Sequence, residues 1–399
     1  MLRQAVVLVG GLGTRLGALT ADVPKPMLPV GGEPFLDILL RNIARHGFEE
    51  VILLARHQAQ KIRDHYASGR IGGAKVKVIE EAGRAGTGGA LREAADLLDD
   101  VFLLSNGDSF FDFNYLALAQ RFGRQHCNIA LALREVPDTG RFGQVSIDQG
   151  GRILHFAEKL PSIGQPGLIN GGVYVAARRI IDDIGPGEVS LETDVMPRLV
   201  EREQIIGMTF EGYFLDIGMP ETYEQAQVEL PAVERRKVVF LDRDGTLNRD
   251  DGYTHRTEDL VFLPGAVDAV RRCNDAGRLV IVVTNQAGIA RGYFDVAQMR
   301  EFNREMNRRL QDAGAHVDAF YFCPHHPNGS VAEFSRTCDC RKPGTGLFEQ
   351  ARSDWRMDLD EAIMIGDKPS DLQAARAFGI RAVQTDGTDL GKIVEDMGL

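Results

Sequence analysis

Short apolar runs alternate with amphipathic stretches from the start of the chain. Apolar residues dominate segments 4–9, 49–55 and 101–108, whereas segments 35–47 and 85–98 repeat their apolar residues with helical spacing. A strand buried on both faces gives a continuous apolar run, and a helix that crosses between two such strands gives an amphipathic one. The pattern therefore predicts βαβ units around a largely parallel sheet.

The same alternation begins again in the second half of the chain. A polar, Pro-containing stretch at 225–237 is followed by the apolar run and glycine turn VVFLDRDGTLN at 238–248. We therefore predict two α/β domains, residues 1–230 and 237–399. In the second domain we expect a helix at 266–277 and strands at 279–285 and 361–367.

Composition and charge narrow the classes of protein that the chain can represent. Its 399 residues are 44% hydrophobic and 26% charged, which is typical of globular proteins of two domains. A formal net charge of -11 disfavours a nucleic-acid partner. No apolar run approaches 18 residues, and the first one is too short for a signal peptide, so we expect a cytoplasmic protein without a membrane span.

Two segments near the amino terminus combine glycines with cations. GGLGTRL at 10–16 follows a predicted strand, so backbone amides and Arg15 can face phosphate oxygens. By itself this segment is more typical of an ordinary tight βα turn. PKPMLPV at 24–30 holds Lys25 between two prolines and returns a second cation to the same loop, although a lone Lys25 could also be a surface lysine.

Together these segments resemble the sugar-1-phosphate nucleotidyltransferase family, whose signature joins a glycine loop containing Arg to a Pro-Lys-Pro segment. The resemblance covers about residues 1–226 and implies a Rossmann-like domain. It also includes GTGGA at 86–90, LSNGD ending at Asp108, INGGVYV at 169–175 and FLDIGMPETY at 214–223.

The resemblance assigns roles to individual residues of this domain. It implies that Asp108 and Asp216 ligate Mg²⁺, that Arg15 and Lys25 stabilise charge on the pyrophosphate leaving group, and that Lys159 contacts the sugar phosphate. Hard oxygen ligands and cations suit a reaction between two anions, which needs no protein nucleophile. Singly, Asp108 could be a helix cap and Asp216 a residue of a surface turn. The remaining residues assigned to substrate binding are Gly11, Gly13, Thr14, Gly88 and Asn170.

The segment EEAGRA at 80–85 departs from the family pattern. It lacks the Pro-Leu pair that often precedes the GTGGA segment, so we assign no base contacts there and expect Glu80 and Glu81 to be solvated. Within the family, the motifs look most like the D-glycero-D-manno-heptose 1-phosphate guanylyltransferases. The mannose-1-phosphate guanylyltransferases are the alternative.

In the second domain, VVFLDRDGTLN places Asp242 and Asp244 two residues apart directly after a predicted strand, so both can point the same way. A calcium loop of the EF-hand type lacks its later ligands here. The segment resembles motif one of the haloacid dehalogenase superfamily phosphatases. The resemblance implies a Rossmannoid fold with Asp242 as the nucleophile and Asp244 as the proton donor.

Later segments match the same superfamily in order. The resemblance implies that Thr284 and Asn285 bind the transferring phosphoryl group, that Lys342 supplies a cation, and that Asp371 is a supporting carboxylate. It assigns Mg²⁺ in this domain to Asp242, Asp244 and Asp367.

A cluster of cysteines and histidines lies between these motifs, in CPHH and CDC. Three thiols and an imidazole are typical zinc ligands, and in a cytosolic chain such clustering favours metal over disulfides. We expect a structural zinc that stiffens the loop delivering Arg341 and Lys342. The predicted ligands are Cys323, His325, Cys338 and Cys340, with His326 as the alternative histidine.

A phosphatase with this zinc loop and the CRKP segment resembles the D-glycero-D-manno-heptose 1,7-bisphosphate phosphatases over about residues 237–392. Histidinol-phosphatases are the nearest relatives. The resemblance implies that Arg341 and Lys368 hold the substrate, and that small loops such as 249–258 cover it.

Taken together, the two resemblances imply a bifunctional enzyme of nucleotide-activated heptose synthesis. It would remove the 7-phosphate of the heptose 1,7-bisphosphate and then transfer a guanylyl group from GTP to the heptose 1-phosphate. One alternative is a mannose-1-phosphate guanylyltransferase fused to another sugar phosphatase or a histidinol phosphatase, and another is an inactive sugar-nucleotide sensor. The expected partners are nucleoside triphosphates and sugar phosphates, whereas the nucleotide base and the oligomeric state stay open.

Overall fold

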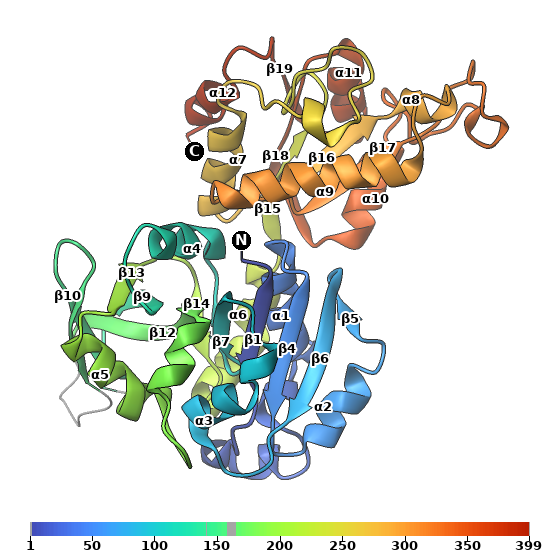
Figure 1. Cartoon of the computed structure of the whole chain (residues 1–399). Coiled ribbons are helices and arrows are strands. Elements are labelled where there is room, and N and C mark those ends of the chain that lie inside the picture. The colour runs from blue at the N-terminus through green and yellow to red at the C-terminus, as the bar shows by residue number, and fades with distance from the viewer. Residues whose placement is uncertain (1, 141, 158–164, 399) are drawn as a thin grey trace. The chain divides into compact units, whose positions relative to one another are not determined.

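The computed structural model describes residues 2–140, 142–157 and 165–398 (Figure 1). Its contacts divide the chain into two compact units, residues 1–233 and 234–399. The division follows helix α6 (Pro220–Val233), so most of the polar stretch 225–237 is helix. Among the described residues, no helix has the length and apolar composition needed to cross a membrane.

The first unit is built on one mixed sheet, in the order β11-β10-β12-β7-β1-β4-β6-β5, with β9 beside β12 and β13 beside β9. β1 pairs in parallel with β4 and β7, whereas β12 is antiparallel to β7, β9 and β10. The predicted largely parallel sheet is therefore wrong for the part around β12, where returning strands pair antiparallel. The strands are β1 (Gln4–Leu8), β4 (Glu50–Ala55), β5 (Arg70–Ile71), β6 (Ala74–Glu80), β7 (Val101–Asn106), β9 (Ile129–Val136), β10 (Gln144–Ile147), β11 (Ile153–Ala157), β12 (Gly167–Ala177) and β13 (Ile205–Thr209).

Strand β1 is apolar from Ala5 to Leu8 because side chains on both of its faces pack into a core. Ala5 and Val7 pack into one core cluster, and Val6 packs into a second cluster on the opposite face of the sheet. Helix α1 contributes to the first cluster, and α3 and α5 contribute to the second. Both faces are covered, as expected for the interior of an α/β sheet. The helices of this unit, besides α6, are α1 (Phe35–Arg45), α2 (Ala59–His65), α3 (Gly86–Glu93), α4 (Tyr115–Gly123) and α5 (Met196–Glu201).

Two small ribbons complete the first unit. Strand β8 (Ser109–Phe111) pairs antiparallel with β14 (Phe214–Asp216), and β2 (Pro29–Val30) pairs with β3 (Glu33–Pro34). In the first ribbon Asp216 lies opposite Ser109, the residue after Asp108. Two acidic residues that are far apart in the sequence therefore become neighbours.

The second unit has a parallel five-stranded sheet in the order β17-β16-β15-β18-β19. Its strands are β15 (Arg236–Leu241), β16 (Leu279–Asn285), β17 (Ala319–Cys323), β18 (Met357–Gly366) and β19 (Arg381–Gln384). Val239 and Leu241 pack on one face, and Val238 and Phe240 pack on the other. The parallel sheet predicted for this unit is confirmed.

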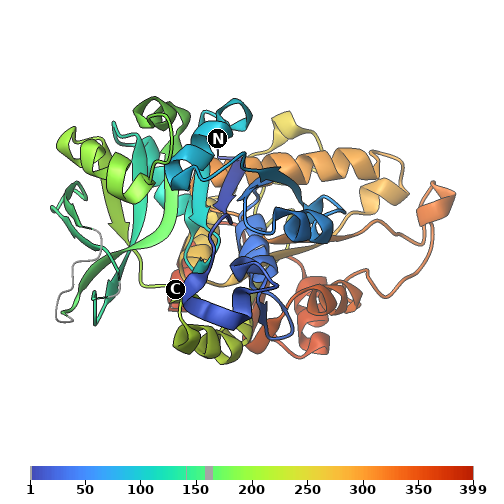
Figure 2. The same cartoon turned by 90° about the horizontal axis from the view of Figure 1, so that it is seen from below.

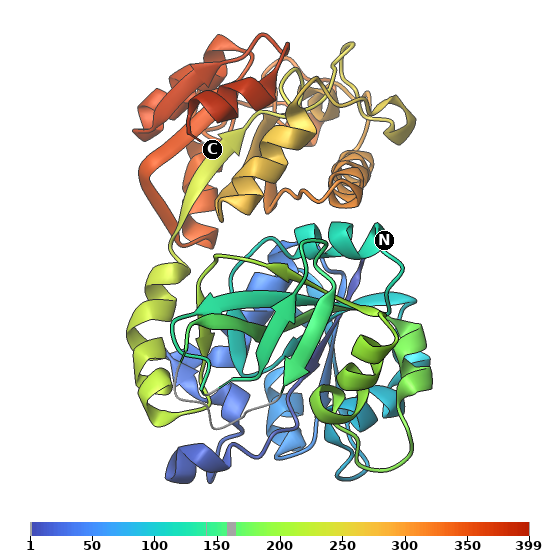
Figure 3. The same ribbon diagram turned by 90° about the vertical axis from the view of Figure 1, so that its left-hand side faces the viewer.

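Helices cover both faces of this second sheet (Figure 3). Helices α7, α9 and α12 pack on the face of Val239, and α10 and α11 pack on the face of Val238. Between β17 and α10 the chain extends away from the sheet around the short 3-10 helix Ala332–Phe334 (Figure 2) and returns to it at Lys342, whose Nζ lies 2.7 Å from the Val283 carbonyl. The helices are α7 (Ala266–Asp275), α8 (Ala287–Ala290), α9 (Val296–Asp312), α10 (Gly346–Asp354), α11 (Pro369–Phe378) and α12 (Leu390–Asp396).

Candidate active sites

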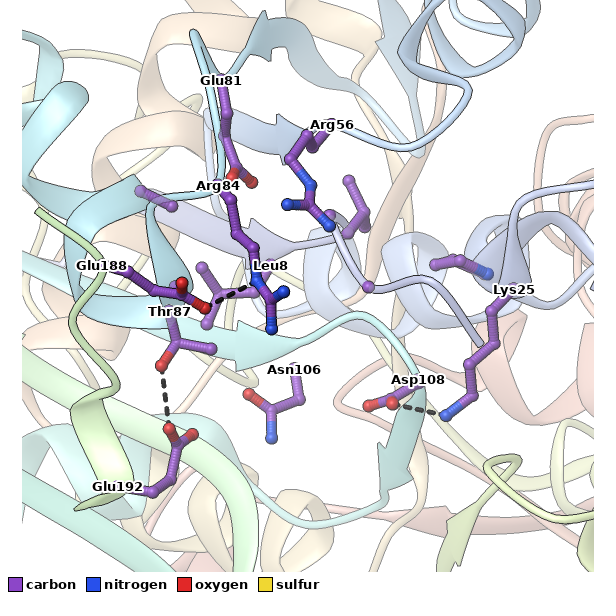
Figure 4. Close-up of a pocket in the computed structure, with 16 residues that line it drawn as sticks. Leu8, Lys25, Arg56, Glu81, Arg84, Thr87, Asn106, Asp108, Glu188 and Glu192 are labelled. Carbon is purple, nitrogen blue, oxygen red and sulfur yellow. Dashed lines mark hydrogen bonds and ion pairs between the residues drawn. The ribbon is translucent and has the colours of Figure 1, made fainter. Parts of the chain in front are cut away.

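The first candidate site gathers Lys25, Asp108 and Asp216 at the end of the central strands. The Lys25 Nζ lies 2.6 Å from the Asp108 Oδ2, and Figure 4 shows the two side chains pointing toward each other across the cavity. The Asp216 Oδ1 accepts the Gly218 amide hydrogen at 2.6 Å. The structure therefore brings together the cation and both carboxylates that the sequence analysis singled out.

The two carboxylates have the electrostatics of a cation site. Burial raises the pKa of Asp216, and the neighbouring Asp108 carboxylate raises it further, against the opposing effect of Lys25. Two neighbouring carboxylates repel each other, and a positive charge between them offsets this repulsion. Their hard oxygen donors fit Mg²⁺, which when bound would neutralise charge on a triphosphate.

The glycine loop contributes backbone to this cavity. Gly10 and Gly11 line it, and a Cβ at Gly10 would lie 2.4 Å from the Glu81 Oε1. A larger residue at position 10 would therefore displace the Glu81 carboxylate from its place over the loop. Gly13 turns the chain with φ +64, and Arg15 then lies exposed on the 3-10 helix Thr14–Thr20. In this structure Gly13, Thr14 and Arg15 do not line the cavity.

Glu81 was expected to be solvated, and for this residue the expectation is wrong. Its side chain is partly buried and lines the cavity together with Arg56 and Arg84 (Figure 4). Burial raises the pKa of Glu81, while Arg56 opposes the shift. Glu80 is exposed and pairs with Arg63, as a solvated residue would. Glu81 directly follows β6, so its place after a strand of the central sheet was the available signal.

The GTGGA segment forms the start of α3 and packs on residues 187–192. The Gly88 amide donates to the Val189 carbonyl at 2.9 Å, and a Cβ at Gly86 would lie 2.4 Å from the same oxygen. The Thr87 hydroxyl donates to Glu192 at 2.8 Å, and both side chains line the cavity. These glycines thus permit close packing that forms one wall of the site.

Asn170, a further predicted substrate contact, lies on β12. The Asn170 Nδ2 donates to the Tyr174 hydroxyl at 2.7 Å, so its side chain is held in place. Lys159 lies outside the described residues.

The second candidate site lies where three parallel strands of the second unit end. Asp242 follows β15, Asn285 ends β16, and Asp367 follows β18. The Lys342 Nζ is buried and lies 2.8 Å from the Asp242 Oδ1, 2.8 Å from the Asp371 Oδ1 and 2.7 Å from the Val283 carbonyl. Burial raises the pKa of Asp242, and the positive charge of Lys342 opposes this shift. Lys342 therefore supports the ionised form of Asp242.

Asp242, Asp367 and Asp371 together offer carboxylate oxygens within 4.8 Å of one another. The Asp367 Oδ1 is buried and has no hydrogen-bond partner within the described part of the chain. A buried carboxylate oxygen without a partner is costly, and a cation would satisfy it. The group therefore fits Mg²⁺, which when bound would offset repulsion between Asp242 and a phosphate. Asp371 is in this group, where the sequence analysis had placed Asp244.

Asp244 is instead held by hydrogen-bond donors. The buried Arg243 donates from its Nε at 2.9 Å and its Nη2 at 2.8 Å, and Gln286 and Asn248 donate at 2.7 Å and 3.1 Å. Burial acts to raise the pKa of Asp244, but the Arg243 charge and these donors outweigh it, so the pKa lies below its usual value. Asp244 is therefore a carboxylate at neutral pH.

Asn285 fixes the loop that holds Lys342. Its Nδ2 donates to the Lys342 carbonyl and its Oδ1 accepts the Lys342 amide, both at 3.0 Å. Thr284 lines the same cavity, and its hydroxyl accepts from Gln286 at 3.0 Å. Both predicted residues thus lie at the Asp242 site. The side chain of Asn285 is hydrogen-bonded to the backbone of Lys342.

Several basic residues also line this cavity. Arg291, His326, Arg341 and Lys368 line it, together with Tyr253 from the loop 249–258. Burial lowers the pKa of His326, and the charges of Arg341 and Arg291 lower it further. Arg341 and Lys368 were singled out from the sequence, whereas Arg291 and His326 were not assigned to this site.

The predicted zinc ligands form one cluster. Cys340 Sγ lies 3.2 Å from Cys323 Sγ and 3.1 Å from Cys338 Sγ, and His325 Nδ1 lies 3.4 Å from Cys340 Sγ. Sulfur ligands bound at about 2.3 Å in a tetrahedron are separated by roughly 3.8 Å, so a small relaxation would seat the metal. The cluster fits zinc, and the structure places His325 in it and His326 in the cavity beside Asp242.

We expect purified protein to contain about one tightly bound zinc per chain. The Cys338→Ser variant should lose this zinc. The activity of its second unit should then be lost at a lower temperature, because the loop that holds Lys342 is no longer fixed by the metal. Elemental analysis and activity after heating measure both effects. Cys273→Ala, which removes a thiol from the core of the same unit, should keep its zinc. Fully active protein that contains neither zinc nor a substitute metal would contradict the site.

Comparison with known proteins identifies the family of the first unit. The family model described as nucleotidyl transferase matches residues 4–232, which is more than half of the chain. The chain belongs to this family. HddC from Yersinia pseudotuberculosis is similar in sequence and fold, with 30% identity and a TM-score of 0.51 over 57% of this chain and 99% of HddC. HddC has also been crystallised in complex with GMP-PN.

The second unit of this nucleotidyltransferase matches a family of another kind. A haloacid dehalogenase-like hydrolase model matches residues 339–389. The D-glycero-beta-D-manno-heptose-1,7-bisphosphate 7-phosphatase of Yersinia pestis is 48% identical over 142 residues, which are 36% of this chain and 76% of that protein. The Escherichia coli K12 protein of the same name is 46% identical over 142 residues, 36% of this chain and 74% of its own length.

The resemblances inferred from the motifs are thereby confirmed. The chain joins a nucleotidyltransferase domain similar to HddC to a phosphatase domain of the haloacid dehalogenase type similar to heptose bisphosphate phosphatases. It is an enzyme with two catalytic domains.

Proposed function

We propose that the chain removes the 7-phosphate of D-glycero-D-manno-heptose 1,7-bisphosphate and then transfers a guanylyl group from GTP to the heptose 1-phosphate, releasing pyrophosphate. The observation that supports it most is the presence, in one chain, of a domain similar to a heptose bisphosphate 7-phosphatase and a domain similar to HddC. The product of the first reaction is then the substrate of the second.

In the phosphatase step, the Asp242 carboxylate attacks the phosphorus of the 7-phosphate. The bond to the sugar oxygen breaks, and an aspartyl phosphate forms. Asp244 is the proposed proton relay. It takes a proton from solvent when the substrate binds, gives that proton to the leaving oxygen, and later takes one from the water that attacks the aspartyl phosphate. Its lowered pKa favours the second of these transfers, because the carboxylate is the resting form. Lys342 stabilises the negative charge of the transferring group.

In the nucleotidyltransferase step, an oxygen of the sugar 1-phosphate attacks the α-phosphorus of GTP, and the bond to pyrophosphate breaks. Lys25 stabilises charge on the pyrophosphate, and Asp108 and Asp216 are the proposed Mg²⁺ ligands. We propose that Arg15 joins the site when GTP binds, and that Lys159 contacts the sugar phosphate. Asn170 and the glycine loop complete the proposed contacts.

Guanine is the proposed base because Glu81 lies in the nucleotidyltransferase cavity. A carboxylate only accepts hydrogen bonds, and the Watson–Crick edge of guanine presents two neighbouring N–H donors. Adenine presents an acceptor at the central position of that edge, which a carboxylate repels. The complex of HddC with GMP-PN supports the same base.

The Glu81→Gln variant should lose preference for GTP. We expect the ratio of kcat/KM for GTP to that for ATP to fall by about tenfold or more, because an amide cannot accept both guanine donors. Glu80→Gln is the matched control, since Glu80 is exposed and pairs with Arg63. An unchanged ratio in Glu81→Gln would contradict the assignment of the base site.

A mannose-1-phosphate guanylyltransferase fused to another sugar phosphatase or a histidinol phosphatase is the competing assignment. A matrix of four nucleoside triphosphates against heptose 1-phosphate and mannose 1-phosphate separates the two for the first unit. Phosphate release from heptose 1,7-bisphosphate and from histidinol phosphate separates them for the second. We expect the highest kcat/KM for GTP with heptose 1-phosphate and for the heptose bisphosphate.

A further inference from the structure

We propose that Arg291 and His326, together with Arg341, form a second anion site in the phosphatase cavity, which holds the phosphate that is not hydrolysed. We call these three residues the basic wall. The inference rests on the proposed function, and it adds how the phosphatase distinguishes a sugar bisphosphate from a monophosphate.

The basic wall is separate from the machinery around Asp242. The Lys342 Nζ contacts the Asp242 and Asp371 carboxylates and the Val283 carbonyl. Lys342 therefore lies beside the phosphate that reacts with Asp242 and is not part of the basic wall. Arg291 and His326 come from other segments, after α8 and after β17, yet they line the same cavity. A substrate seated at Asp242 therefore has a second cationic surface within the same cavity.

Within the described residues, the guanidinium groups of the basic wall have no carboxylate partner. No ion pair involves Arg291 or Arg341, and the Arg291 Nε is buried without a hydrogen-bond acceptor. A buried donor without an acceptor is unfavourable, and an anionic ligand would satisfy it. Asp250 also lines the cavity, but its Oδ1 accepts from the Gly252 amide and from Thr254.

Arg291 is held in place by aromatic contact rather than by an acid. Its guanidinium carbon lies 5.6 Å from the centre of the Tyr253 ring, and Tyr253 in turn packs edge-on against Tyr293 at 4.8 Å. A guanidinium that contacts an aromatic face does not use its N–H donors on an acid, so these donors stay available to a ligand. The planar fork of Arg291 can therefore bind phosphate oxygens in pairs.

His326 adds a neutral donor. Its Nδ1 accepts the Asn328 amide hydrogen at 3.1 Å, so in the neutral ring the proton is on Nε2. The Arg341 guanidinium donates through Nη1 to the His325 carbonyl at 3.3 Å, which leaves its other nitrogens for a ligand. Two guanidinium groups and one imidazole N–H match the charge and the acceptor oxygens of a phosphate monoester dianion.

The test compares a bisphosphate with a monophosphate in the full-length protein. We expect the Arg291→Gln variant to lower kcat/KM for heptose 1,7-bisphosphate by about tenfold or more, mainly through KM, and to change kcat/KM for heptose 7-phosphate by less than twofold. Arg291→Lys should recover part of the loss, because it restores the charge without the planar fork. Arg300→Gln, an exposed arginine on α9, is the matched control and should leave both substrates unaffected.

Equal losses on both substrates, or no loss on the bisphosphate, would overturn the basic wall. If the wild-type enzyme hydrolyses neither heptose phosphate, the proposed function fails, and the same comparison is made with fructose 1,6-bisphosphate and fructose 6-phosphate. A loss in Arg291→Gln confined to that bisphosphate supports the second anion site without the heptose assignment. An equal response to the two fructose phosphates overturns it.

Discussion

The Asp242→Asn variant is expected to lose phosphate release by roughly 10⁴-fold or more while nucleotidyl transfer stays within twofold of the wild type. The amide keeps the shape of the side chain but cannot attack phosphorus. Lys342 and Asp371 surround Asp242 in the second unit, and no residue of the nucleotidyltransferase cavity belongs to that group.

Two assays on the same preparation measure this effect, phosphate release from the heptose bisphosphate and pyrophosphate release from GTP with heptose 1-phosphate. Asp360→Asn, an exposed aspartate on β18, is the control for changing a carboxylate in this unit. A folded Asp242→Asn protein that loses both activities equally would contradict two independent sites.

The reciprocal effect is expected from Lys25→Ala, which should lower nucleotidyl transfer by about 10²–10³-fold and leave phosphate release unchanged. Lys25 is buried and its Nζ lies 2.6 Å from the Asp108 carboxylate, so the variant removes a fixed positive charge where pyrophosphate charge develops. Lys75→Ala, an exposed lysine of the same unit, is the matched control. If Lys25→Ala transfers nucleotide at the wild-type rate, Lys25 has no role in the reaction.

Much of the second site follows from the sequence, because its residues stand at the ends of apolar strands. Asp242, Asn285 and Asp367 each end or follow a strand of a parallel sheet, and parallel strands bring their carboxyl ends to one edge. The spacing of Cys323, Cys338 and the neighbouring His325 likewise pointed to one cluster. For such residues, local pattern and sheet geometry determine the outcome.

Other features depend on contacts between distant segments and could not be predicted from local pattern. Glu81 was expected to be solvated, but the fold places it over Gly10 in the cavity. The antiparallel pairing of β12 with β7 departs from the predicted sheet, because connections of variable length allow either direction. Arg243 is hydrogen-bonded to Asp244, and no spacing rule anticipates that a fully buried arginine lies between the two proposed catalytic aspartates.

The order of the two reactions is the central claim, and phosphorus NMR of heptose 1,7-bisphosphate tests it most directly. Without nucleotide, the 7-phosphate signal should disappear and the 1-phosphate signal should survive. Addition of GTP and Mg²⁺ should then produce pyrophosphate and the two phosphorus signals of GDP-heptose. Loss of the 1-phosphate signal before the 7-phosphate signal would contradict the account, because no phosphate oxygen would remain to attack GTP.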